Sequence, residues 1–204
     1  MRLGSLSAKY ESNGKPGTVS TGYGDAGGVS YGTYQLASNA GSVKSFVNWL
    51  KSRGHSYGNA LGQYTPGSAE FTSLWKEIAA VDPGGFEQLQ HDYIQYAYYE
   101  PAVAKLKRAY FNIENHTDVM KDVVWSRAVQ YGTGYIVEMF QSAVKFLGYP
   151  NLSYVDASNF DADMIKSVYL NVCKTPEWTN GSPSLRTGLY NRFDNECKDA
   201  LARI

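Results

Sequence analysis

Most of the chain has the apolar spacing of amphipathic helices. In SVKSFVNWLKSRG, residues 42–54, the apolar residues Val43, Phe46, Val47 and Leu50 fall on one helical face, and Gly54 is a suitable stop. Comparable patterns predict further helices, over residues 68–81, 118–132, 135–147, 159–173 and 184–204. Another helix starts at Asp82-Pro83 and either runs through residues 86–101 or restarts at Pro101.

The N-terminal region follows a different pattern. Residues 3–11 predict a short helix with Ser5 as its cap. Residues 13–37 are rich in Gly, Ser and Thr, with β-forming residues on both sides of a glycine turn, which predicts a small β-hairpin or meander. No internal repeat or linker interrupts the pattern. We expect a single, mainly α domain over residues 1–204, with a small N-terminal β-hairpin and a large helical lobe.

Composition narrows the possible partners. The 204 residues contain 19 Lys and Arg and 19 Asp and Glu, so the formal net charge is zero, which argues against a nucleic-acid partner. No segment has the length of a transmembrane helix, and residues 1–12 lack the apolar stretch of a signal peptide. We expect a monomer that does not insert into membranes, is made in the cytoplasm, and reaches any external substrate by a separate release route.

Residue types that bind metals are scattered. Cys173 and Cys197 have no metal-ligand spacing, and His55, His91 and His116 lie far apart in the sequence. We expect no metal site and no cofactor. Two free thiols are the simpler interpretation of the cysteines, with a disulfide as the alternative.

Two isolated carboxylates mark a candidate active site. In residues 10–36, YESNGKPGTVSTGYGDAGGVSYGTYQL, Glu11 is the only glutamate and Asp25 the only aspartate. Glycoside hydrolysis needs one carboxylic acid to protonate the leaving oxygen and a second carboxylate to activate water or attack the sugar. Glu11 at a helix end suits the acid, and Asp25 on a glycine-rich hairpin suits an ionised, solvated base. A surface hairpin with stray charges is the other interpretation.

Several other polar and aromatic residues are candidates for substrate binding. The 17 tyrosines suit sugar recognition as well as core packing. Tyr31 and Tyr34 are expected on one face of a strand, where they line a cleft or pack on the helical lobe. Gln35 is expected either to form a hydrogen bond with an N-acetyl sugar or to connect the hairpin to the helical lobe. Gln130-Tyr131 is expected either to face the cleft or only to end a helix.

Other charged residues have structural interpretations. Asp118 is expected to cap the helix over residues 118–132. Arg192 and Glu196 are four positions apart and are expected to pair along the last helix.

The motifs around the two carboxylates resemble those of a known group. Tyr10-Glu11-Ser12, followed by Gly32-Thr33-Tyr34-Gln35-Leu36, resembles the lysozyme-like superfamily. The segment Gly22 to Tyr34 is similar to the chitosanase-like muramidase branch, which includes phage endolysins and peptidoglycan-degrading extensions of secretion spike proteins. The similarity extends over most of the chain. Val29 departs from the aromatic residue of the chitosanase turn, which puts chitosan specificity in doubt.

The resemblance implies a lysozyme-like α+β fold with an active-site cleft between hairpin and helical lobe. It implies Glu11 as general acid, Asp25 as general base and Ser30 as the hydroxyl that helps to hold the water. The implied substrate and partner is the peptidoglycan glycan strand, and the implied reaction is cleavage of its β-1,4 bonds by an inverting mechanism. A lytic transglycosylase would use Glu11 alone, and a non-catalytic glycan-binding domain of a phage or secretion particle would need neither carboxylate.

Overall fold

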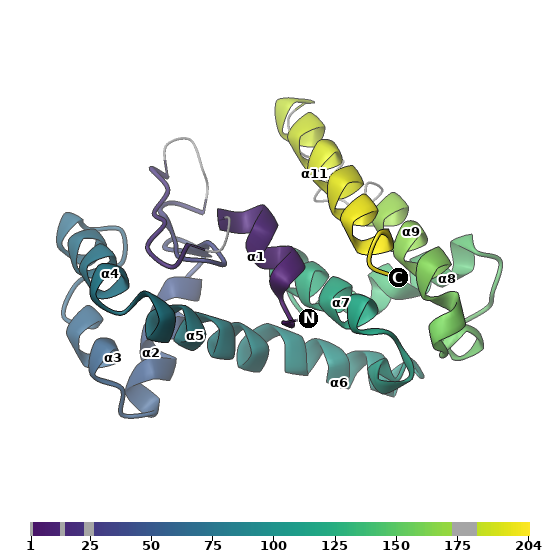
Figure 1. Cartoon of the computed structure of the whole chain (residues 1–204), viewed down its shortest axis with the longest axis horizontal. Coiled ribbons are helices and arrows are strands. Elements are labelled where there is room, and N and C mark those ends of the chain that lie inside the picture. The colour runs from purple at the N-terminus through teal and green to yellow at the C-terminus, as the bar shows by residue number, and fades with distance from the viewer. Residues whose placement is uncertain (1, 13–14, 23–26, 173–182) are drawn as a thin grey trace. The chain divides into compact units, whose positions relative to one another are not determined.

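The computed structural model describes residues 2–12, 15–22, 27–172 and 183–204. Within these ranges the protein is mainly helical, with one two-stranded antiparallel sheet, as the sequence predicted (Figure 1). The chain divides into two compact units. We call residues 11–95 the hairpin unit and residues 1–10 with 96–204 the terminal unit. Each is described by itself.

The hairpin unit combines the small sheet with helices. Strand β1 (Ser30–Tyr31) pairs with β2 (Leu36–Ala37), with Ser30 opposite Ala37 and Tyr31 opposite Leu36. The helices of this unit are α2 (Ser42–Ser52), α3 (Ser56–Leu61), α4 (Ala69–Val81) and α5 (Pro83–Ile94). The sequence did not predict α3.

An aromatic cluster forms the core of the hairpin unit. Phe46 of α2 contacts Trp75 of α4 and Tyr93 of α5, and the Trp75 and Phe86 ring centroids are 4.7 Å apart. The predicted face of α2 is confirmed, because Val43, Phe46, Val47 and Leu50 are all buried. Helices α4 and α5 begin where the sequence predicted, and both are capped, since Ser68 accepts from the Phe71 amide and Asp82 from the Gly85 amide.

The terminal unit is a helical bundle. Its elements are listed in chain order: π-helix η1 (Gln95–Tyr99, shared with the hairpin unit at Gln95), α6 (Glu100–Arg108), 3₁₀ turn η2 (Ile113–Asn115), α7 (Asp118–Tyr131), α8 (Ile136–Phe146), 3₁₀ turns η3 (Leu152–Val155) and η4 (Ser158–Phe160), α9 (Asp161–Val172) and α11 (Pro183–Leu201). Helix α1 (Ser5–Ser12) begins in this unit. Helices α8 and α9 lie side by side, and α11 packs on α9 (Figure 1).

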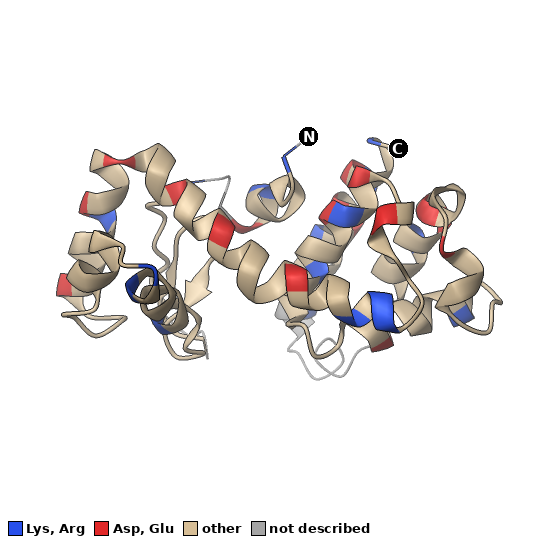
Figure 2. Cartoon of the chain, turned by 90° about the horizontal axis from the view of Figure 1, so that it is seen from below, with Lys and Arg blue, Asp and Glu red and all other residues tan. Residues whose placement is uncertain are grey.

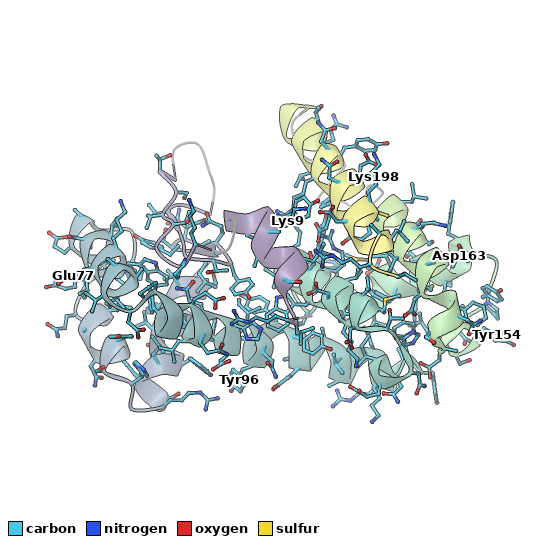
Figure 3. The ribbon with its side chains drawn as sticks, viewed as in Figure 1. Lys9, Glu77, Tyr96, Tyr154, Asp163 and Lys198 are labelled. Carbon is cyan, nitrogen blue, oxygen red and sulfur yellow. The ribbon has the colours of Figure 1, made fainter. Side chains whose placement is uncertain are left out.

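The helix that starts at Asp82-Pro83 runs through residues 86–101 and does not restart at Pro101. Helix α5 continues through η1 into α6 without an intervening loop, and Pro101 lies at the start of α6, directly after the π-helical segment. Tyr96, on η1, is exposed (Figure 3).

Two predicted caps are wrong. The residue that caps α7 is Thr117, whose hydroxyl oxygen accepts from the Met120 amide, and Asp118 is the first helical residue. Ser5 is likewise the first residue of α1, and its hydroxyl donates to Asp122 of α7. The predicted pair on the last helix is confirmed, with Arg192 Nε 3.7 Å from Glu196 Oε2.

Both signs of charge are spread over the helices of each unit (Figure 2). Across the described ranges, no helix is both long and apolar enough to cross a membrane. The same residues contain no group of three or more His, Cys, Asp or Glu side chains arranged to hold a metal ion. Cys197 is a free, half-buried thiol, and Cys173 lies outside the described residues.

Candidate active site

The helix that carries Glu11 is fixed at its N-terminus by a carboxylate from a distant part of the chain. Asp122 is buried and accepts hydrogen bonds from the Gly4 amide at 2.6 Å, the Leu6 amide at 3.0 Å and the Ser5 hydroxyl at 2.9 Å. Arg203 Nη1 lies 3.2 Å from the same carboxylate. A negative group at a helix N-terminus binds otherwise unpaired N–H groups and favours the helix dipole.

The burial of Asp122 has an electrostatic cost. Burial raises the pKa of its carboxyl above the usual 3.8, although the Leu6, Ser5 and Gly4 donors and the Arg203 guanidinium all oppose that rise. These four donors therefore offset much of the desolvation of the charge without removing it.

The other end of α1 is held by a second carboxylate. Lys9 and Tyr10 both donate to Asp199 Oδ2 on α11, with the Tyr10 bond at 2.6 Å (Figure 3). The Lys9 and Tyr10 hydrogen bonds lower the pKa of Asp199 below 3.8, against the effect of burial. Glu11, a partly exposed residue, follows Tyr10 directly on the same helix. Asp122 of α7 thus holds the start of α1, and Asp199 of α11 holds the two residues directly before Glu11.

The second motif forms a tight turn between the strands. We call residues Gly32 to Leu36 the motif turn. Gly32 has φ 79°, and a Cβ there would meet Oε1 of Gln90. The buried Thr33 donates its amide to that same oxygen at 2.8 Å. Glycine is therefore required at position 32 both by backbone conformation and by close packing.

Gln90 is a residue that the sequence interpretation missed. It is buried on α5, and its Nε2 donates to the Pro16 carbonyl at 3.2 Å while its Oε1 holds the motif turn. The signal was present, since Gln90 is a polar residue on the same helical face as Phe86, Tyr93 and Ile94. A buried amide with partners on both sides is a positioning device for the loops that it joins.

The predicted strand placement is confirmed for Tyr31 and wrong for Tyr34. Strand β1 ends at Tyr31, and Tyr34 lies in the motif turn, where its ring centroid is 6.5 Å from that of His91. Tyr31 is fully buried, its ring packs on Phe71 and Trp75, and its hydroxyl shares a hydrogen bond with Thr72 at 2.8 Å. The packing interpretation therefore describes Tyr31 in this structure.

Ser30 and Gln35 have local structural contacts. Ser30 is buried at the start of β1, and its amide donates to the Ser20 hydroxyl at 2.8 Å. Gln35 has φ 49°, and its Nε2 donates to the Gly32 carbonyl at 2.9 Å, within the motif turn. Their roles toward a substrate stay predictions. Asp25 lies outside the described residues.

Gln130 and Tyr131 belong to the terminal unit, at the end of α7. Oε1 of Gln130 accepts no hydrogen bond from the residues that the structure describes. The Tyr131 ring lies 6.2 Å from the Phe193 ring, centroid to centroid. Helix α7 ends as predicted, with Gly132 as its C-cap.

Comparison with known proteins assigns the chain to a protein family. The family described as type VI secretion system spike protein VgrG3-like, C-terminal, matches residues 3–197. The chain belongs to this family. The type VI secretion system spike protein VgrG3 of Vibrio cholerae serotype O1 is 37% identical over 131 residues, which cover 64% of this chain. Those residues are 12% of the length of that relative, so this chain corresponds to a small part of it.

The match to the spike-protein family covers the whole candidate site. Residues 3–197 include α1 with Glu11, the glycine-rich segment, the motif turn and Gln130-Tyr131. Asp199 and Arg203, which help to hold α1, lie just beyond that match. The family is thus defined over the same residues that the motif resemblance covers.

A buried ion pair connects the two helices that hold α1. Arg127 of α7 and Glu196 of α11 are both fully buried, with Nη2 2.8 Å from Oε2, and Ser126 also donates to Glu196. Burial opposes ionisation of Glu196, but the Arg127 guanidinium and the Ser126 hydroxyl outweigh it and hold the pKa of Glu196 below 4.5. The Arg127 guanidinium also lies 4.6 Å from the Tyr169 ring centroid.

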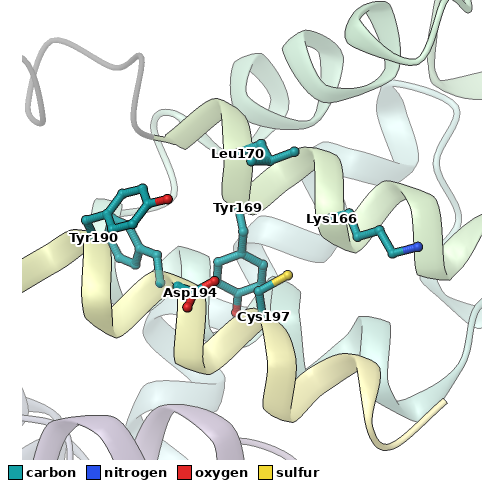
Figure 4. A pocket seen from close by; sticks show the side chains of 7 residues that line it. Lys166, Tyr169, Leu170, Tyr190, Asp194 and Cys197 are labelled. Atoms are coloured by element: carbon teal, nitrogen blue, oxygen red, sulfur yellow. The ribbon is translucent and has the colours of Figure 1, made fainter.

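The described residues also line two cavities, one in each unit. One, of about 260 Å³, opens between α9 and α11 in the terminal unit and is mostly apolar; it is lined by Lys166, Tyr169, Leu170, Tyr190, Phe193, Asp194 and Cys197 (Figure 4). The other, of about 470 Å³, has a mixed polar and apolar lining and lies within the hairpin unit.

Proposed function

We propose that the chain is a peptidoglycan hydrolase that cleaves β-1,4 glycosidic bonds of the cell-wall glycan. The observation that carries the proposal is membership of the spike-protein family over residues 3–197, together with the Tyr10-Glu11-Ser12 and Gly32–Leu36 motifs inside that range. Their resemblance to the chitosanase-like muramidases supports a glycan substrate. As part of a spike protein, the domain would be delivered to the wall by the secretion apparatus.

In this proposal Glu11 protonates the oxygen of the scissile glycosidic bond. Asp25 takes a proton from a water molecule, which attacks the anomeric carbon from the opposite face, and Ser30 helps to orient that water. The bond between sugar and leaving oxygen breaks as the bond to water forms, so the anomeric configuration inverts. No cofactor takes part in this scheme.

The support of α1 favours this role for Glu11. A general acid must be held at hydrogen-bonding distance from the leaving oxygen, and misplacement by about 1 Å can cost a hundredfold in rate. Asp122 and Asp199 hold the residues from Gly4 to Tyr10, so the backbone just before Glu11 has fixed partners. The buried Arg127–Glu196 pair joins the helices that carry these two carboxylates.

The proposal is tested by the clearing of purified peptidoglycan suspensions. Glu11→Gln is nearly isosteric and removes the proton donor, so the lysis rate should fall by roughly a hundred- to ten-thousandfold. Glu77→Gln makes the same chemical change on the exposed face of α4 and should leave the rate unchanged (Figure 3). Near wild-type lysis by a folded Glu11→Gln protein, or no lysis by the wild type, would contradict the proposal.

A further inference from the structure

The cavity of the hairpin unit combines an apolar base with polar and cationic side chains. Its volume is about 470 Å³, and it lies among the segment after β2, helix α2, the end of α3 and the loop before α4. The lining residues are Ser38, Asn39, Lys44, Val47, Asn48, Lys51, Leu61, Gly62, Tyr64, Thr65, Pro66 and Phe71. Val47, Leu61 and Phe71 are buried and form an apolar base, whereas the polar side chains are more exposed.

The charge of this cavity has one sign. Lys44, Asn48 and Lys51 recur at helical spacing, so they share one face of α2. Among the described residues that line the cavity, these two lysines carry the only charges. Neither ammonium group forms an ion pair with a carboxylate in the described part of the chain. A cavity with two ammonium groups and several amides and hydroxyls favours an anionic, polar ligand.

The Lys51 side chain lies against the end of α3. The end of the Lys51 side chain lies over Gly62, because a Cβ on Gly62 would meet both its Cε and its Nζ. Gly62 is the C-cap of α3, and a positive group near a helix C-terminus is favourable. The Lys51 ammonium therefore lies close to the C-terminal end of α3.

The cavity shares a wall with the glycine-rich segment. The backbone N–H of Asn39 donates to the Gly27 carbonyl at 2.9 Å, and the backbone N–H of Ser38 donates to the Val29 carbonyl at 2.8 Å. A Cβ on Gly28 would lie 2.7 Å from Cγ of Asn39, so backbone and side chain are in direct contact. Residues 27–29 immediately follow the segment in which the sequence places Asp25.

We propose that this cavity binds a carboxylate of the peptide stem attached to the glycan, with Lys44 and Lys51 as its cationic ligands. The inference rests on the proposed function for the identity of the ligand. A peptidoglycan strand carries short peptides with free carboxylates beside its sugars, and the amides of Asn39 and Asn48 can bind the peptide backbone. The cavity would then select strands that still carry their peptides.

The experiment measures binding without cleavage, in the Glu11→Gln background. The probe is a soluble disaccharide-peptide with free carboxylates, titrated by NMR or calorimetry against the same compound with amidated carboxylates and against the peptide-free disaccharide. The carboxylate form should bind best, and the Lys44→Gln/Lys51→Gln double variant should weaken its binding about tenfold. The double variant should leave binding of the amidated and peptide-free compounds unchanged.

A matched control is Lys76→Gln on α4, another exposed lysine, which should not change the affinity. Equal affinity for the three compounds, or an unchanged affinity in the double variant, would overturn the inference. With an active enzyme, the double variant should raise KM on intact walls and leave kcat unchanged. Because the binding titration needs no turnover, it reports on the cavity even if the clearing assay shows no lysis.

Discussion

The two motif segments of the candidate site are held in different ways. Helix α1 is attached by charged groups, with Asp122 at one end and Asp199 at the other. The motif turn is attached by a neutral hydrogen bond that the Thr33 amide donates to Gln90 Oε1, and Tyr31 beside the turn is packed among aromatic rings. The helix that carries Glu11 is therefore held mainly by charged groups, whereas the motif turn is held by a neutral hydrogen bond and lies beside aromatic packing.

This difference reflects the two cores. The terminal unit contains a fully buried ion pair, Arg127–Glu196, between the helices that support α1. The core of the hairpin unit is built around Phe46, Trp75 and Phe86. Removing one partner of a buried ion pair leaves the other charge buried and unpaired, which destabilises the fold. An aromatic core is less sensitive to changes of charge nearby. Changes of charge and changes of shape should therefore affect different segments.

The largest effect is expected from Glu196→Ala. The change leaves the Arg127 guanidinium buried without its carboxylate, so the free energy of unfolding should fall by about 3–5 kcal/mol. The measurement is urea denaturation followed by circular dichroism. Glu114→Ala, at an exposed carboxylate that lies 3.6 Å from Lys121, is the control and should change stability by less than about 0.5 kcal/mol. Equal stability of the two variants would show that the ion pair does not support the terminal unit.

An intermediate effect is expected from Gly32→Ala in the motif turn. Position 32 has a left-handed backbone conformation, and the added Cβ meets Gln90 Oε1. The free energy of unfolding should therefore fall by about 2–4 kcal/mol. Gly84→Ala, where a Cβ meets nothing within 4 Å, is the control. In a Gln90→Ala background the cost of Gly32→Ala should be smaller, because the clash with Gln90 is gone and only the 2.9 Å approach to Trp75 Cζ2 remains. Strict additivity of the two changes would contradict the close-packing account.

The smallest effect is expected from Lys9→Ala. Lys9 pairs with Asp199 at the surface, where an ion pair contributes about 0.2–1 kcal/mol. Lys9 and Tyr10 lower the pKa of Asp199, so their contribution is fully present above pH 3.8 and is lost as the pH falls through the lower pKa of the folded state. The stability difference between wild type and Lys9→Ala should therefore shrink in acid. A difference that grows below pH 3.8 would contradict this pairing.

Local signals in the sequence predicted most helices. The apolar face of α2, the caps Ser68 and Asp82 and the glycine after α7 all act within a few residues, so their effects can be recognised from neighbouring positions. The Thr117 cap was missed because it lies one residue before Asp118, which carries an equally suitable side chain. Thr and Asp are both good N-cap residues, and the extended backbone conformation of Thr117 makes it the cap.

Long-range partners could not be predicted. The cap of α1 comes from Asp122, 116–118 residues away, and Gln90 is 57 residues from the Thr33 that it holds. The burial of Tyr31 depends on Phe71 and Trp75, which a strand pattern does not contain. Glu196 was predicted to pair with Arg192, but its 2.8 Å contact with Arg127 requires the packing of α7 on α11.

The central claim is that Glu11 and Asp25 together hydrolyse the glycan. Its most direct test is mass spectrometry of the fragments released from purified peptidoglycan in heavy-oxygen water. The account predicts reducing ends that carry one heavy oxygen in the wild type, and a loss of these products in both Glu11→Gln and Asp25→Asn. Fragments that end in 1,6-anhydro sugars, released by the wild type and by Asp25→Asn alike, would contradict it, because that reaction needs Glu11 alone and no water.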